Sequence, residues 1–326
     1  MENEMSYRIK QVPEDFIVIE KPSLALVEGG KYAYFTVRKK GYTTLRAVHM
    51  IARVLGIEYK RVGYCGSKDK QAVTEQAFSI NDMPKERLAG LRLPGVEINF
   101  IGRGERPLRL GELEKNHFRI IIREIQNLPT PISRYVNYYG SQRFGRHNAA
   151  VGRALVRRRY VEAITLICES SDEYADQLHT FIGEHPNNPI GALRLLPKTL
   201  LMLYVHAYQA ILWNETVERY LEERGSALSA PLIGFGTQAS DPLINKIVED
   251  ILTREGLTPR DFVFRDMPEL CAEGGERAIF VDVPNLVVGR LEDNELGPGK
   301  KSCVEFSLPP GSYATVFIDQ LFSAAL

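Results

Sequence analysis

Segments patterned as β-strands lie at both ends of this chain, and a helix-rich stretch separates them. β-branched residues fill the segment 7–20 around Pro13, and a second strand-like segment follows at 32–38. Near the other end, segments at 303–308 and 313–319 read as strands joined by the turn signal Pro309-Pro310-Gly311. Strands of one type on both sides of a different stretch indicate that the middle of the chain is an inserted domain.

Helical periodicity interleaves with the N-terminal strands. Thr43 or Thr44 can cap a helix that Gly56 ends, and its apolar residues recur at helical spacing: Leu45, Val48, Ala52 and Leu55. Further strands are expected at 74–80, 96–102 and 118–123, with a short helix at 84–91. Because several neighbouring strands can pair antiparallel, the predicted fold class is α+β with a mixed, largely antiparallel sheet.

Composition excludes several classes of protein. The 326 residues are 44% hydrophobic, enough for two domain cores, and 41 basic residues balance 41 acidic ones. The four cysteines form no C-x-x-C pair and do not cluster with histidines, which argues against a zinc site or a disulfide framework. The first residues lack a signal-peptide pattern, and the most apolar helix, 200–213, is too short to span a bilayer. We expect a cytoplasmic protein with no membrane partner.

The middle of the chain contains a long helix that follows Pro197 and stops at Gly225. It is apolar enough to form the core of a second domain. His206 on this helix is expected to be a core or interface histidine, because no serine, cysteine or metal-ligand partner lies at a useful spacing.

Two short polar segments of the N-terminal region are candidates for chemistry. Asp69 lies between Lys68 and Lys70 on a glycine-flanked turn, and Asn116 lies in a Lys-Asn-His segment expected to be a turn before a strand. Read alone, both are ambiguous, because Lys-Asp-Lys is typical of a solvated turn and asparagine commonly satisfies its own backbone in turns.

Charge is segregated along the chain despite the neutral total. Residues 134–160 contain seven arginines and no acidic residue, with Tyr135, Tyr138, Tyr139 and Phe144 interleaved, whereas 161–193 contain six carboxylates and no lysine or arginine. Arginines bind phosphates bidentately and aromatic rings stack on unpaired bases, so 134–160 predicts a nucleic-acid surface. The alternative is a solvated basic helix.

Five blocks of the sequence resemble the TruD family of tRNA pseudouridine synthases. They are PEDFIVIE (13–20), GSKDKQAVTEQ (66–76), LGELEKNHF (110–118), NYYGSQRFG (137–145) and GSYAT (311–315), and they occur in the family order. Agreement of five separate blocks is far more specific than any single motif.

The resemblance implies a pseudouridine-synthase catalytic domain at 1–135 and 289–326, with a helix-rich α/β TRUD domain inserted at 136–288. It implies that Asp69 is the nucleophile and Lys10 its basic partner. Four residues would line the uracil pocket: Phe16, Asn116, Phe118 and Tyr313. The tRNA backbone would be held by the arginine set, Arg143, Arg146, Arg153, Arg157, Arg158 and Arg159. Tyr313 stands where the family pattern leads us to expect phenylalanine, and His117 where a small residue is common.

The implied activity is isomerisation of a tRNA uridine, by resemblance uridine 13 of the D-arm, with no metal or other cofactor and no obligatory protein partner. Lys68, Lys70 and Lys10 are expected to favour the ionised Asp69 carboxylate. That carboxylate could attack C1′ or C6 of the nucleotide, or act as base in a glycal-type elimination. The rival hypothesis is a non-catalytic RNA-binding or RNA-folding protein with the same basic surface. A nucleotide-dependent enzyme is disfavoured because no convincing P-loop is present.

Overall fold

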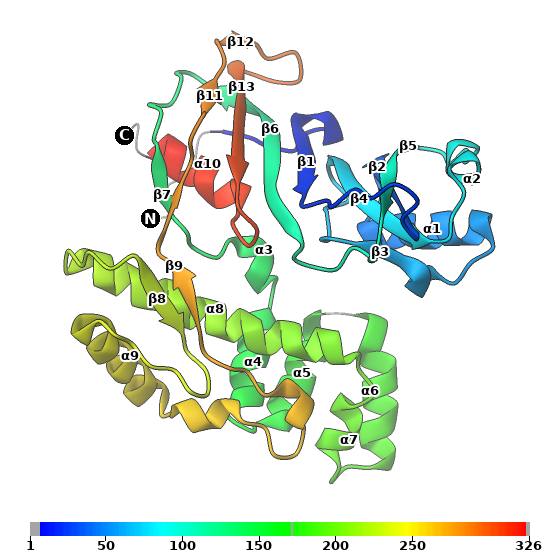
Figure 1. Cartoon of the computed structure of the whole chain (residues 1–326). Coiled ribbons are helices and arrows are strands. Elements are labelled where there is room, and N and C mark those ends of the chain that lie inside the picture. The colour runs from blue at the N-terminus through cyan, green and yellow to red at the C-terminus, as the bar shows by residue number, and fades with distance from the viewer. Residues whose placement is uncertain (1–6, 171, 324–326) are drawn as a thin grey trace. The chain divides into compact units, whose positions relative to one another are not determined.

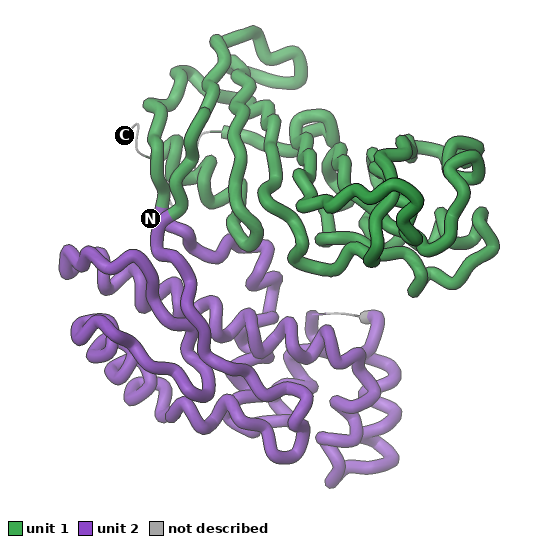
Figure 2. Tube along the Cα trace, viewed as in Figure 1, with its two compact units in different colours: residues 1–135, 281–326 green, residues 136–280 purple. Residues whose placement is uncertain are grey.

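The computed structural model describes residues 7–170 and 172–323 (Figure 1). The chain divides into two compact units, shown in Figure 2. Unit 1 comprises Met1–Tyr135 and Val281–Leu326, and unit 2 comprises Val136–Phe280. None of the helices within the described residues is long and apolar enough to cross a membrane.

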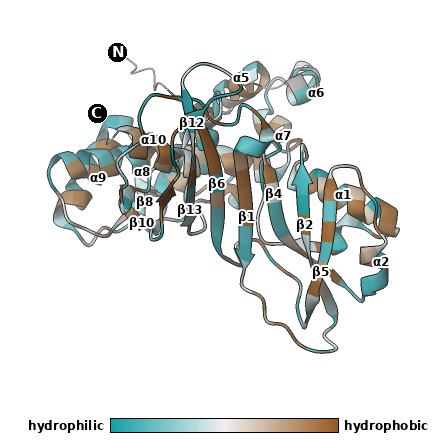
Figure 3. Cartoon of the chain, turned by 90° about the horizontal axis from the view of Figure 1, so that it is seen from above, coloured by the Kyte–Doolittle hydropathy of each residue, from teal (hydrophilic) through white to brown (hydrophobic). Residues whose placement is uncertain are grey.

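Unit 1 is built around a mixed sheet. Within the described residues it has nine strands, in the order β11-β13-β6-β1-β4-β2-β5, with β12 beside β13 and β3 beside β4. The strands are β1 (Phe16–Pro22), β2 (Tyr32–Lys40), β3 (Val62–Tyr64), β4 (Val73–Asn81), β5 (Val96–Gly104), β6 (Leu113–Ile125), β11 (Val287–Val288), β12 (Glu292–Asp293) and β13 (Lys300–Leu308). β1 and β4 are parallel, and the other pairs are antiparallel, which confirms the predicted mixed and largely antiparallel sheet. Figure 3 shows β6, β1, β4, β2 and β5 side by side.

Two helices cover one face of this sheet. α1 (Thr44–Leu55) begins at the predicted Thr43 cap and ends at Gly56, whose φ of 67° is the left-handed conformation that glycine adopts readily. Its buried side of Val48, Ile51 and Leu55 packs with residues of β2 and β4. α10 (Ala314–Ser323) packs on β6 and β13, where Phe317 and Phe306 have ring centroids 4.5 Å apart.

The segment 313–319 was predicted to be a strand, but all of it after Tyr313 is helical and lies in α10 (Ala314–Ser323). Its buried residues are Ala314, Phe317, Ile318 and Leu321, which is the i, i+3, i+4, i+7 spacing of a helix. The predicted window of seven residues was too short to separate this period from a strand pattern.

The segment 115–117, predicted to be a turn, lies inside β6. Asn116 pairs with Glu20 of β1 on one side and with Leu308 of β13 on the other. Two flanking strands satisfy the backbone of Asn116 and override its preference for turns. In the 7–20 segment, strand β1 begins only at Phe16, after a 3₁₀ turn η1 (Pro13–Asp15).

Two further elements of unit 1 are short: η2 (Tyr59–Arg61) and α2 (Lys85–Ala89). The chain passes from unit 1 to unit 2 within β7 (Arg134–Val136). β7 pairs with β10 (Phe280–Asp282). Residues 134–160 do not form one basic helix, since they contain β7 and two separate helices, α3 (Ser141–Phe144) and α4 (Asn148–Val156).

Unit 2 is helix-rich and packs around α8 (Lys198–Glu222), the long helix expected after Pro197. Trp213 on α8 is fully buried and donates a hydrogen bond from Nε1 to the Ala230 carbonyl oxygen. α4 crosses α8 closely, because Gly152 lies against the Tyr204 backbone where a Cβ would not fit. The other elements are α5 (Tyr160–Ser170), α6 (Asp172–Glu184), α7 (Pro189–Leu193), β8 (Ser229–Leu232), α9 (Pro242–Glu255), η3 (Pro259–Phe262), η4 (Pro268–Leu270) and β9 (Gly275–Ala278).

Candidate active site

Asp69 lies on the loop between β3 and β4, and its carboxylate contacts Lys10. The Lys10 Nζ donates to Asp69 Oδ2 at 2.8 Å. The Asp69 side chain is 50% exposed, whereas that of Lys10 is only 16% exposed. The Lys10 Nζ also lies 4.3 Å from the centroid of the Phe16 ring, which is cation–π geometry. The solvent-accessible carboxylate of Asp69 is therefore paired with the Lys10 ammonium, which also contacts the face of the Phe16 ring.

The Lys10 backbone has an unusual conformation. Its φ of 57° lies in the left-handed region, which side chains other than Gly, Asn and Asp rarely adopt. The immediately following residues lead into η1 and then into β1, which begins at Phe16. Backbone strain at a residue whose side chain contacts the candidate nucleophile is typical of a functional site.

One face of the sheet carries a polar group of side chains near the Asp69 loop. Residues that pair across adjacent strands point to the same face, so the pairings Lys39–Thr74, Thr74–Val18 and Val18–Phe118 define one row. Glu20 and Asn116 form a pair two residues further along, on the same face. This is the face that α1 and α10 cover at its two ends.

A buried network of hydrogen bonds and one ion pair connects the Asp69 loop to the sheet and to α1. The Lys68 ammonium pairs with the fully buried Glu20 carboxylate. The Lys68 backbone N–H donates to Thr44 Oγ1 at 2.9 Å, and Thr44 in turn donates to Gln76 Oε1 at 2.7 Å. Gln76 Nε2 closes the network by donating to the Gly66 carbonyl oxygen at 2.8 Å. The conformation of the loop therefore depends on side chains from β1, β4 and α1.

Lys68 was expected to support the charge of Asp69, and the structure directs its ammonium to Glu20 instead. The physical reason is burial, because a carboxylate removed from water needs a counter-charge. Lys70 is exposed. Lys10 alone among the three expected lysines has an ammonium in contact with the Asp69 carboxylate.

Lys39 is a further residue of this site that sequence reasoning missed. It is only 1% exposed, and its Nζ donates to the Tyr42 carbonyl oxygen at 2.6 Å and to the Asp69 carbonyl oxygen at 3.3 Å. Burial lowers the pKa of Lys39 to about 8. A signal was available in the sequence, because Lys39 continues the alternating series Ala33, Phe35, Val37 whose members all face the core.

The residues expected to line a uracil pocket lie around this face. Phe16 and Phe118 are 4% and 7% exposed and make an edge-to-face contact with centroids 6.1 Å apart. Asn116 Oδ1 is buried and has no hydrogen-bond partner within the described residues. Tyr313 is half-buried and immediately precedes α10. Their contact with a base stays a prediction.

The arginine set lies in unit 2, and several of its members contact their own unit. The Arg153 Nε lies 2.7 Å from Glu255 Oε2, and Arg157 bonds both the carboxylate and the carbonyl oxygen of Glu255. The Arg158 guanidinium donates to the Val263 carbonyl oxygen at 2.7 Å and packs 4.3 Å from the Phe264 ring centroid. These three arginines help to hold unit 2 together.

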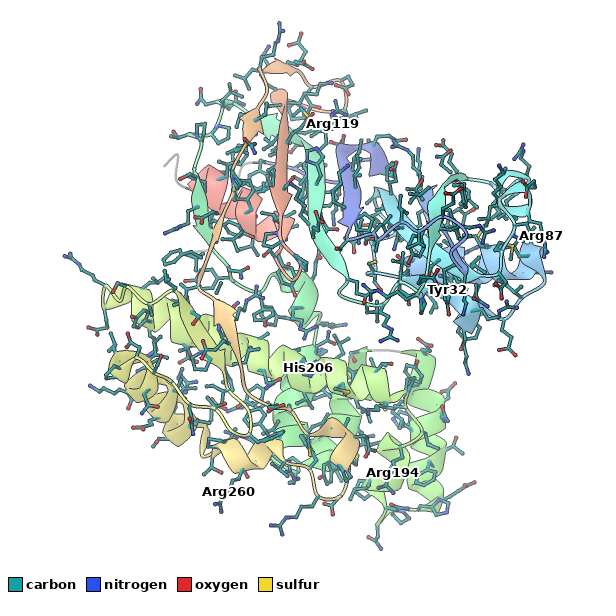
Figure 4. All side chains as sticks on the ribbon, in the orientation of Figure 1. Tyr32, Arg87, Arg119, Arg194, His206 and Arg260 are labelled. Atoms are coloured by element: carbon teal, nitrogen blue, oxygen red, sulfur yellow. The ribbon has the colours of Figure 1, made fainter. Side chains whose placement is uncertain are left out.

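The other three arginines of the set are placed differently. Arg143 is half-buried, with its guanidinium 6.0 Å from the Tyr139 ring centroid. Arg146 is exposed, and Arg159 makes only an exposed pair with Glu162 at 3.4 Å. His206 (labelled in Figure 4) lies half-buried on α8, and burial together with Arg143 lowers its pKa. Arg146 and Arg159 are thus the members of the set that are most accessible to a polyanion.

Comparisons with known proteins show the family of the chain. A family model described as tRNA pseudouridine synthase D (TruD) matches residues 2–181, 174–227 and 215–321. The chain is 30% identical to tRNA pseudouridine synthase D of Aquifex aeolicus, over 98% of each protein. A relative from Thermococcus onnurineus with the same enzyme name is 27% identical over 96% of this chain and 94% of the relative.

A solved structure shares the fold. The crystal structure assigned to tRNA pseudouridine synthase D of Methanosarcina mazei matches with a TM-score of 0.75 and 24% identity, covering 98% of this chain and 94% of that one. The mixed α+β architecture matches that structure, and the family model together with the relative from Aquifex aeolicus gives the class of enzyme, a pseudouridine synthase. More particularly, the chain belongs to the tRNA pseudouridine synthase D (TruD) family, whose members are isomerases.

Proposed function

We propose that this protein isomerises a uridine of tRNA to pseudouridine and that Asp69 is the reacting carboxylate. The observation that carries the proposal is the 2.8 Å contact between Lys10 Nζ and the solvent-accessible Asp69 carboxylate, on a loop fixed by a buried network. By family resemblance the target is uridine 13 of the D-arm.

The reaction exchanges one bond for another within the nucleotide. The C1′–N1 bond breaks, the uracil turns, C1′ joins C5, and the hydrogen of C5 is replaced by one on N1. No group enters or leaves, so the protein must supply an ionised carboxylate and a pocket that retains the detached base. The carboxylate would attack C1′ or C6, or remove a sugar proton in a glycal route. In each route Lys10 would hold the Asp69 carboxylate in place.

The buried polar groups near the loop suit recognition of a base. We propose that Asn116 accepts a hydrogen bond from the target uracil, because its buried Oδ1 has no partner within the described residues. Phe16 and Tyr313 would offer ring faces, and Phe118 would support Phe16 from behind. A uracil N–H would then satisfy the orphaned oxygen, whereas cytosine has no N–H at that ring position.

We further propose that unit 2 corresponds to the inserted family domain that was expected at 136–288, and that its exposed arginines contact the tRNA backbone. The compact unit itself ends at Phe280. Segments 289–326 and 1–135 both lie in unit 1, which holds all the proposed catalytic residues.

The test of the proposed reaction is Asp69→Asn, which keeps the shape of the side chain and removes its charge. Because Asp69 is half exposed, its ion pair contributes less than about 1 kcal/mol to stability, so folding and tRNA binding should be retained. Pseudouridine formation, mapped by carbodiimide treatment and primer extension on the modified tRNA, should be abolished. Asp82→Asn is the matched control, since Asp82 is an exposed aspartate of the same unit whose left-handed φ of 51° asparagine tolerates. Wild-type product from the Asp69→Asn protein would exclude Asp69 as the reacting carboxylate, whereas a wild-type protein that binds tRNA and forms no pseudouridine would favour the rival RNA-binding role.

A further inference from the structure

Lys39 is a charged residue at a position where the fold needs an apolar one. In β2 it follows Ala33, Phe35 and Val37 on the side that packs under α1, and all four side chains are buried. Within residues 7–170 and 172–323, no carboxylate oxygen lies within 4.0 Å of the Lys39 Nζ. Burying an ammonium without a close counter-ion costs stability, so packing alone does not explain a lysine here.

The ammonium does have two specific acceptors, and both are backbone carbonyl oxygens at the site. One belongs to Tyr42, in the turn just before the Thr43 cap of α1, at 2.6 Å. The other belongs to Asp69 itself, at 3.3 Å. Lys39 therefore joins the start of α1 to the backbone of the residue that carries the reacting carboxylate.

A second bond reinforces the same connection one residue earlier. The Lys68 N–H donates to Thr44 Oγ1, on the first residue of α1. Consecutive residues of the loop are thus connected to the start of α1, Lys68 directly through its N–H and Asp69 through the Lys39 ammonium, which also binds the Tyr42 carbonyl. The Asp69 side chain is bound separately by Lys10. With its backbone and its carboxylate both held, Asp69 has little freedom to rotate.

We propose that Lys39 is a positioning residue for pseudouridine formation, whose ammonium holds the Asp69 backbone so that the carboxylate meets its target in a productive geometry. This inference rests on the proposed role of Asp69. A displacement of about 1 Å in a reacting group can lower a rate by about 10²-fold without changing substrate affinity. Lys39 would consequently affect kcat rather than KM.

The charge of Lys39 gives this role a pH dependence. The charged groups that act on it are Asp69, which raises its pKa, and Lys68, which lowers it, while burial dominates and lowers the pKa to about 8. Its partners across β4 and at the start of α1, Thr74 and Thr44, are neutral. As the pH rises through about 8, Lys39 loses the charge that strengthens its bonds to the two carbonyls. Turnover should therefore fall on the alkaline side.

The experiment measures kcat, KM, melting temperature and the pH profile on a tRNA transcript for wild type, Lys39→Met, Lys40→Met and Asp69→Asn. Methionine matches the length of lysine without its charge. Lys40 is the matched control, because it is the exposed neighbour in β2 and pairs with Glu14. We expect Lys39→Met to lower kcat by at least about tenfold with KM within about twofold, and to leave the melting temperature unchanged or higher. Lys40→Met should resemble wild type.

Three outcomes would overturn the inference: wild-type kcat in Lys39→Met, an equal loss in Lys40→Met, or a loss that follows the melting temperature and disappears on cooling. Should Lys39→Met not fold, the wild-type pH profile decides, since a kcat that stays flat from pH 7 to about 9.5 contradicts the role of the charge. Failure of the proposed function looks different, because Asp69→Asn would then retain activity or wild type would lack it.

Discussion

The carboxylate of Glu20 and the ammonium of Lys68 form an ion pair that is closed to solvent, one residue before the proposed nucleophile. The Glu20 side chain is fully buried and that of Lys68 is 9% exposed. The second Glu20 oxygen accepts a hydrogen bond from the Ala77 N–H at 3.3 Å. The pair therefore fastens the Asp69 loop to β1 and β4.

Glu20→Gln should destabilise unit 1 by about 3 kcal/mol, because it leaves the buried Lys68 ammonium without its counter-charge. The double variant Glu20→Gln with Lys68→Met should recover much of this stability while activity stays low, since the loop is no longer fastened. Urea denaturation followed by circular dichroism measures the first effect. Glu14→Gln, which breaks the exposed pair with Lys40, should change stability by less than about 1 kcal/mol. Equal effects of Glu20→Gln and Glu14→Gln would contradict this interpretation.

Lys10→Met should lower the single-turnover rate of pseudouridine formation by about 10²-fold, because the Asp69 carboxylate loses its only ammonium contact within the described residues. Stability should change little, since Asp69 is half exposed. Lys10→Arg should retain part of the rate by keeping the charge. Lys70→Met serves as the control, because Lys70 is an exposed lysine on the same loop. A Lys10→Met enzyme that reacts at the wild-type rate would show that the pair is incidental.

Sequence patterns between neighbouring residues predicted much of the secondary structure of unit 1. The predictions that failed concern residues whose structure depends on contacts distant in the sequence. Helix α1 followed from Thr43 and Gly56, whose effects depend only on neighbouring residues. Asn116 was placed in a turn because its pairing partners, Glu20 and Leu308, are about 100 and 190 residues away. The contact between Lys10 and Asp69 came from family resemblance, since no spacing rule connects residues 59 positions apart.

The partners of the arginine set were also not predictable from neighbouring residues. Its composition was apparent in the sequence, but the partner of Arg153 and Arg157 is Glu255, about 100 residues later. Lys39 differs from both cases, because it continues the alternation of β2 on the buried side, but the strand predicted at 32–38 ended one residue before it.

The contacts of Glu255 predict that acid lowers the stability of unit 2. Burial raises its pKa, but hydrogen bonds from Tyr208 and Arg153 outweigh this and hold the pKa of Glu255 below its ordinary value of 4.5. A carboxylate with a lowered folded-state pKa contributes stability above its unfolded value and loses it as the pH falls through the folded one. Unit 2 should therefore weaken below about pH 4.5, and this dependence should be smaller in Glu255→Gln. Trp213, the single tryptophan, is fully buried in unit 2, so its fluorescence reports this unit selectively. Parallel acid transitions in the two proteins would contradict the prediction.

The two kinds of arginine in unit 2 should differ in their effect on tRNA affinity. Arg146 and Arg159 are exposed, whereas Arg153 and Arg157 are bound to Glu255. Replacing Arg146 and Arg159 by alanine should raise the Kd for tRNA and reduce the slope of log K against log salt by about 1.4 to 1.8, which corresponds to two lost phosphate contacts. Replacing Arg153 and Arg157 should mainly lower the stability of unit 2, visible in Trp213 fluorescence.

The control for the salt experiment is Arg260→Ala, an exposed arginine on η3 that lies outside the arginine set (Figure 4). Its substitution removes one positive charge from the same unit and should leave the slope nearly unchanged, because a charge away from the bound backbone releases no counter-ion. If the Arg146 and Arg159 variant keeps the wild-type slope, these arginines are only a solvated face, and the tRNA backbone must contact other residues. If all the variants reduce the slope equally, net charge and not a defined surface governs binding, because long-range attraction depends on total charge while counter-ion release depends on contact.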